Sequence, residues 1–81
     1  MTKNNVAQWL GNRGWDIEST DIIKSKQVGN YIFIQQKEEP NEVALFDLYD
    51  SYAEIIDYYS TETFQWNLNY LRKLITGECQ E

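Results

Sequence analysis

Apolar residues near the start of the chain recur with the period of a helix. Val6, Trp9 and Leu10 fall at i, i+3 and i+4, and Arg13 follows at i+7. Gly14 stands where a left-handed residue commonly ends a helix. We therefore expect a short amphipathic helix that ends before Gly14.

The next segment carries the alternation of a strand. Residues 15–18 alternate apolar and polar side chains, and we expect an irregular strand to continue to residue 26. Val28, Gly29 and Asn30 have the composition of a turn. This pattern places a first strand directly before a second one.

The clearest local signal is a hairpin over residues 31–48. Residues 31–36 are rich in β-branched and aromatic side chains, and residues 42–48 form a second apolar run. Residues 37–41 between them have turn chemistry, and Pro40 fits in that loop because it cannot donate to a ladder. Two paired strands are predicted.

Two helices are predicted after the hairpin. Ser51 and Glu54 match a capping box, S-x-x-E, which begins the first of them. Apolar side chains follow at helical spacing, at Tyr52, Ile55, Ile56 and Tyr59. The second helix aligns Phe64, Leu68, Leu71 and Ile75 and ends at Gly77.

These elements predict one α+β domain over residues 1–81. The order is α-β-β-β-α-α, with helices packed on a three-stranded antiparallel sheet. The predicted buried residues are Trp9, Leu10, Ile32, Ile34, Ile56, Leu68 and Leu71.

Composition argues for a folded protein without a catalytic centre. Aromatic residues make up 15% of the chain, too many for a disordered acidic tail. There is no histidine, and Cys79 is the single cysteine, so common metal ligands and general bases are missing. No phosphate-binding or nucleophile motif is present. We expect no enzyme activity, no cofactor and no metal.

Charge is distributed unevenly. From residue 38 to residue 71 there is no Lys or Arg but eight carboxylates, while the whole chain has a net charge of −6. If the predicted helix forms, Asp50, Glu54 and Asp57 lie on one of its faces, with Asp47 just before it. Their spacing of ~5–6 Å is comparable to that of charges along a nucleic-acid backbone. An acidic surface kept for solubility is the alternative.

Three aromatic residues are further candidates for a protein interface. Trp66 and Tyr70 are expected opposite the apolar seam of the last helix, where they can anchor a partner. Tyr58 is expected at the edge of the acidic helical face. The alternative for each is packing within or at the boundary of the core.

In size, charge and element order the chain resembles the short acidic inhibitors of phages and mobile elements, namely the anti-CRISPR and anti-restriction DNA mimics. No motif is shared, so no site residues are carried over, and the N-terminal third is slightly basic where such mimics are often acidic throughout. The resemblance implies an inhibitor that blocks a basic groove. A regulatory or immunity-type interaction module anchored by surface aromatics remains open beside it.

The expected partner is a protein with a basic surface, of the kind that binds nucleic acid. Direct contact with nucleic acid or an anionic membrane is not expected, because phosphates are bound through Lys and Arg. Without an apolar leader or span, a cytoplasmic location is expected. The oligomeric state stays open.

Overall fold

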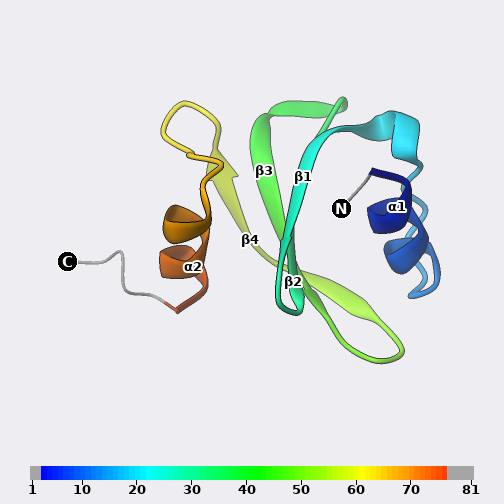
Figure 1. Cartoon of the computed structure of the whole chain (residues 1–81). Coiled ribbons are helices and arrows are strands. Elements are labelled where there is room, and N and C mark those ends of the chain that lie inside the picture. Colours follow the sequence, from blue (N-terminus) through cyan, green and yellow to red (C-terminus); the bar gives the residue numbers. More distant parts are fainter. Residues whose placement is uncertain (1–2, 77–81) are drawn as a thin grey trace.

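The computed structural model describes residues 3–76, with side chains from Asn5 onward. Four antiparallel strands form one sheet in the order β1-β2-β3-β4, so neighbours in the chain are neighbours in the sheet (Figure 1). The elements are α1 (Lys3–Gly11), η1 (Ser19–Asp21), β1 (Ile22–Val28), β2 (Tyr31–Gln36), β3 (Glu39–Leu48), β4 (Ala53–Ser60) and α2 (Leu68–Thr76).

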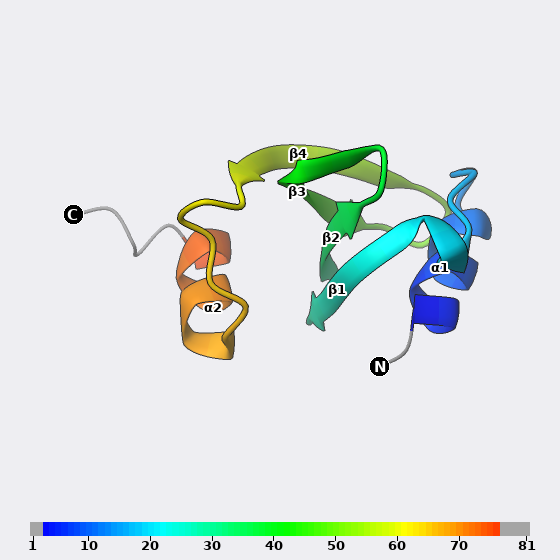
Figure 2. The same ribbon diagram turned by 90° about the horizontal axis from the view of Figure 1, so that it is seen from above.

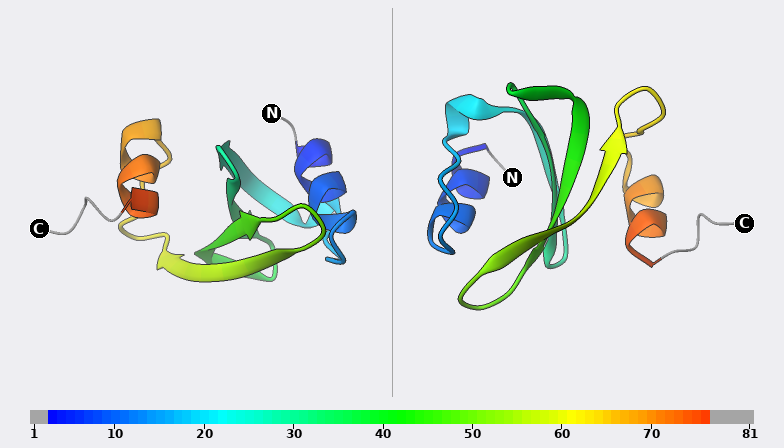
Figure 3. Two further views of the ribbon diagram at one scale, coloured as in Figure 1. Left: turned by 90° about the horizontal axis from the view of Figure 1, so that it is seen from below. Right: turned by 180° about the vertical axis from the view of Figure 1, so that it is seen from behind.

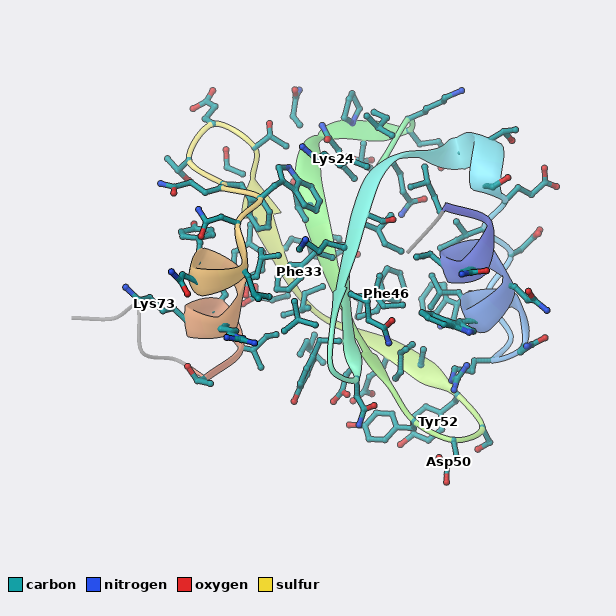
Figure 4. The ribbon with its side chains drawn as sticks, viewed as in Figure 1. Lys24, Phe33, Phe46, Asp50, Tyr52 and Lys73 are labelled. Carbon is teal, nitrogen blue, oxygen red and sulfur yellow. The ribbon has the colours of Figure 1, made fainter. Side chains whose placement is uncertain are left out.

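The two helices lie on opposite sides of the sheet (Figures 2 and 3). Val6 and Leu10 of α1 pack with Phe46 in one buried cluster, whereas Leu71 of α2 packs with Phe33 in a second. Figure 4 shows Phe46 directed toward α1 and Phe33 toward α2. The sheet therefore separates two small cores.

This arrangement explains the continuous apolar runs of the central strands. Successive side chains of a strand point to opposite faces of the sheet. In β2 and β3, the pair Ile32–Phe46 faces α1 and the next pair, Phe33–Leu45, faces α2. Because a helix covers each face, both sets are buried and the strands lose the polar alternation of a half-exposed sheet.

The β1–β2 turn is confirmed. Val28 pairs with Tyr31 across Gly29 and Asn30, and Gly29 has a φ of 63°. Glycine adopts this left-handed region without the strain of a side chain, and a tight hairpin turn requires it.

The helix predicted over residues 51–59 is wrong, because these residues enter strand β4. Tyr49 donates its backbone N–H to the Tyr52 carbonyl at 2.8 Å, which closes a tight turn in front of the strand. Ser51 lies in that turn and begins no helix. The sheet thus has four strands and the described chain two α-helices, in place of three of each.

Three boundaries also differ from the prediction. Residues 15–18 form a loop, so the first strand begins only at Ile22. Pro40 lies inside β3, at an irregular section where the register with β2 shifts between Gln35 and Gln36. A proline is tolerated there because the ladder is already interrupted. The predicted helix end at Gly77 lies outside the described residues, as does Cys79.

The predicted core is confirmed at Leu10, Ile32, Ile34 and Leu71, all of which are fully buried. Trp9 is half-buried against the α1-side cluster. The prediction is wrong at Leu68, which is 40% exposed at the start of α2. It is also wrong at Ile56, which is exposed on edge strand β4.

Candidate protein-binding site

Five of the seven predicted site residues come together on the β3–β4 hairpin. Asp47 lies near the end of β3, Asp50 in the turn, and Glu54, Asp57 and Tyr58 in β4. Figure 4 shows Asp50 at the tip of the hairpin, away from both helices. The hairpin is therefore the first candidate surface.

Two of the carboxylates are neighbours because of strand pairing. Asp47 is paired with Glu54 across β3 and β4. Directly paired residues have Cβ atoms ~4.5–5.5 Å apart, and like charges at this distance repel each other. The Asp47–Glu54 pair therefore concentrates negative charge on the side of the sheet that faces α2.

The Tyr49 hydroxyl lies between these carboxylates. It donates a 3.3 Å hydrogen bond to Glu54 Oε2, and Asp47 is its other acceptor. The hydrogen bond to Asp47, reinforced by partial desolvation and by the charges of Asp47 and Glu54, raises the pKa of Tyr49 to about 12.

The tip of the hairpin is held by aromatic stacking and by the segment after α1. The rings of Tyr49 and Tyr52 stack with their centroids 4.5 Å apart. Arg13 Nε donates to the Tyr49 carbonyl at 2.6 Å, and Trp15 Nε1 donates to the Ala53 carbonyl at 2.8 Å. These contacts hold the hairpin turn that carries Asp50 against the segment that follows α1.

A bulge lies in the middle of β4. The register with β3 runs from Phe46–Ile55 to Leu45–Asp57, so Ile56 is an extra residue. Asp57 Oδ1 accepts a 2.8 Å hydrogen bond from the backbone N–H of Tyr58. Bulges of this kind commonly re-aim side chains at the edge of a sheet.

Exposed apolar side chains accompany the carboxylates. Tyr58 is 54% exposed, Tyr52 49% and Ile56 46%. The sequence pattern missed Ile56 because helical spacing placed it in the core. The sequence feature that indicates a strand here is the adjacent pair Ile55 and Ile56, because isoleucine favours strands. Together with Tyr49, these side chains give the hairpin the mixture of apolar area and charge that protein interfaces use.

The predicted acidic helical face does not exist. Asp50 is in a turn, and Glu54 and Asp57 are three residues apart in a bulged strand, a separation of roughly 10 Å along the chain. The predicted similarity to the charge spacing of a nucleic-acid backbone depended on helical geometry, so it does not hold for these residues. Only the cross-strand pair Asp47–Glu54 retains such a spacing.

Trp66 and Tyr70 are not exposed anchors opposite the core. Both are half-buried and pack edge-on against Phe64, with centroids 4.8 and 5.5 Å away. Lys24 Nζ of β1 lies 5.4 Å from the Trp66 ring, within range of a cation–π contact. Since α2 begins at Leu68, Trp66 precedes the helix. These aromatics belong to the core boundary on the α2 side.

The two edges of the sheet differ in sign. Edge strand β1 carries Lys24 and Lys26 and no carboxylate, whereas edge strand β4 carries Glu54 and Asp57 and no basic residue. This separation follows from the fold, because the two strands are 24 residues apart in sequence and lie at opposite ends of the sheet order. It gives β4 a one-signed field.

A groove of about 400 Å³ lies beside the hairpin on the α2 side, lined by Val28, Tyr31, Asp47, Arg72, Ile75 and Thr76 among others. It contains one carboxylate and one guanidinium, so it does not extend the acidic surface. Within the described residues, no three acidic or cysteine side chains gather as metal ligands would. None of the helices in residues 3–76 is long and apolar enough to cross a membrane.

No protein-family model matches the chain, no curated protein matches it, and no solved structure matches its fold. What the protein does must therefore be inferred from its own residues and their geometry.

Proposed function

We propose that this protein is a small acidic binding protein of the inhibitor type, which engages a basic protein surface through the β3–β4 hairpin. The observation that carries the proposal is the composition of edge strand β4: both of its charged residues, Glu54 and Asp57, are negative, and Ile56 and Tyr58 are exposed next to Asp57. A partner with Lys and Arg would relieve the repulsion and cover the apolar area.

The class of partner follows from its required charge. Concentrated basic surfaces are the electrostatic footprint of proteins that bind nucleic acid. An acidic domain that covers such a surface competes with phosphates for the same Lys and Arg residues. We therefore propose that binding to this protein and binding to nucleic acid exclude each other on the partner.

A generic interaction module is the second candidate, and the exposure of Tyr52, Ile56 and Tyr58 favours it. In that case apolar burial supplies the affinity and the carboxylates only steer the encounter. The two candidates differ in salt dependence, because added salt screens exposed charges and leaves apolar contacts intact.

The test begins with capture of partners from the native host's lysate on the tagged protein. Affinity for each captured, purified protein is then measured by calorimetry from about 50 to 500 mM salt, with and without competing DNA. The variant Glu54→Gln/Asp57→Asn is compared with Asp16→Asn/Glu38→Gln. Each variant raises the net charge of −6 by two units, and all four side chains are exposed.

We expect Glu54→Gln/Asp57→Asn to weaken binding about tenfold at low salt, since two surface charges at ~0.7 kcal/mol each amount to a factor of ten. The control pair should stay within about twofold. Equal affinities for the two variants would refute the proposed surface. If DNA fails to compete, the nucleic-acid class of partner is wrong, and a shallow salt dependence identifies the apolar module.

A further inference from the structure

The outer edge of β4 is the less protected edge of the sheet. Edge strand β1 carries Lys24 and Lys26, and lysines on an edge discourage pairing with another chain. The side chain of Lys24 is also held against Trp66. Edge strand β4 has neither lysine nor proline in its eight residues, and beyond its bulge at Ile56 residues 57–60 pair regularly with β3.

The pairing of β4 with β3 determines which backbone groups face outward. In an antiparallel pair, residues that bond to the partner strand alternate with residues whose backbone groups point away from it. The hydrogen bond from Thr61 N–H to the Asn41 carbonyl, 3.1 Å long, marks an inward pair at one end. By this alternation Tyr59 and Asp57 are the next residues that bond to β3. The backbone N–H and C=O groups of Tyr58 and Ser60, which lie between the bonded positions, therefore point outward.

A side chain already occupies one of these outward groups. The Tyr58 N–H is bonded at 2.8 Å to Asp57 Oδ1 and not to β3. The carboxylate oxygen stands where the carbonyl oxygen of an added strand would accept the same hydrogen. At the other end of β4, the Trp15 indole N–H donates to the outward Ala53 carbonyl. The open edge is therefore residues 55–60.

We propose that residues 55–60 bind an extended segment of the basic partner as a fifth strand of the sheet. This inference rests on the proposed function and specifies how the partner is held. A Lys or Arg of the segment pairs with Asp57 and draws its carboxylate away from Tyr58, whose N–H then bonds to the segment's backbone. Backbone pairing supplies affinity, and the side chains select the segment.

The two faces of β4 define that segment. Glu54 and Asp57 pair with Asp47 and Leu45 and so face α2, whereas Ile55 pairs with Phe46 and faces α1. Tyr58 pairs with Ala44, also on the α1 side. Since side chains of an added strand alternate in the same way, the fitting segment alternates basic and apolar residues.

A second copy of the chain fits this edge less well. Pairing β4 with β4 of another copy places two acidic strands side by side, which like-charge repulsion disfavours. Pairing β4 with the basic β1 edge of another copy joins opposite charges but does not close, so it leads to open polymers. A foreign basic segment avoids both problems.

The probe is an acetylated and amidated peptide of about nine residues in which lysine alternates with valine. Two variants carry backbone N-methyl groups, one at every valine and the other at every lysine. Because successive N–H groups of a strand point to opposite edges, only one variant blocks the edge that meets β4. A peptide of the same composition with its lysines in one block controls for charge.

We expect one N-methylated variant to lose at least tenfold in affinity while the other stays within about twofold. Hydrogen exchange at the amides of Tyr58 and Ser60 should slow at least tenfold in the complex, and the block peptide should bind more weakly. Equal effects of the two methylation patterns, without slowed exchange, overturn strand addition. If the affinity for the peptide nevertheless falls with Glu54→Gln/Asp57→Asn, the proposed function stands without strand addition.

The self-association alternative is tested on the free protein by sedimentation at about 100 μM. A monomer whose outward Ser60 amide exchanges freely supports an edge that is open to a partner. Dimers or polymers that are broken by Glu54→Lys/Asp57→Lys would overturn the proposal, because the edge would then be covered by another copy of the chain.

Discussion

The most informative stability test replaces Trp15 with phenylalanine. The Trp15 indole makes two contacts that hold the loop after α1 on the hairpin. Its Nε1–H donates to the Ala53 carbonyl at 2.8 Å, and its ring packs edge-on against Phe46 at 5.0 Å. Phenylalanine keeps part of the aromatic contact and loses the hydrogen bond.

The expected cost of Trp15→Phe is about 2 kcal/mol. The lost hydrogen bond contributes about 1 kcal/mol, the middle of the usual range of about 0.5–1.5 kcal/mol. The smaller ring forfeits roughly 40 Å² of apolar burial, about 1 kcal/mol at ~25 cal/mol/Å². For a domain of this size the melting temperature should fall by about 8–16 °C.

The assay is urea unfolding followed by far-UV circular dichroism, with Trp9→Phe as the matched control. Trp9 is also half-buried against the α1-side cluster, and its indole N–H makes no hydrogen bond with the described residues. Trp9→Phe should therefore cost only the area term, about 1 kcal/mol. Equal midpoint shifts for the two variants would show that the Trp15–Ala53 hydrogen bond contributes nothing.

Two further results are expected. Leu71→Ala should lower the free energy of unfolding by about 2–5 kcal/mol, because Leu71 is fully buried. Leu68→Ala should lower it by no more than about 1.5 kcal/mol, because Leu68 is 40% exposed. Thermal unfolding of both variants checks this, and a larger loss for Leu68→Ala than for Leu71→Ala would contradict it. The pKa of Tyr49 is raised from 10.0 to about 12 in the folded state, so the unfolded state releases this proton first and stability falls as pH rises from 10 toward 12. Tyr49→Phe should remove that part of the fall in urea unfolding at pH 9 and 11, and identical pH slopes for the variant and the unchanged protein would refute it.

The sequence by itself determined the first helix and the central hairpin. Val6 and Leu10 have one consistent period, and no competing pattern overlaps them. Residues 31–36 are β-branched and aromatic without helical spacing, so propensity and pattern agree. Where local signals agree, the surroundings have little to decide.

Strand β4 was decided by the tertiary structure. Tyr52, Ile55, Ile56 and Tyr59 satisfy the spacing of a helix, and Ser51 with Glu54 adds a capping signal. The same segment is rich in residues that favour strands. Pairing with residues 42–48 of β3 favours the strand, since each cross-strand contact adds stabilisation that an isolated helix of this length lacks.

The acidic stretch was readable from the sequence, but its geometry was not. Asp47 and Glu54 become neighbours only through the register of β3 and β4, and the outward direction of the Tyr58 N–H depends on the same pairing. The packing of Trp66 against Phe64 likewise requires the sheet and α2 to meet. Composition determined that this protein carries a stretch of one charge sign. The pairing of each strand with its neighbour in the sheet, which no local pattern encodes, decided where those charges lie.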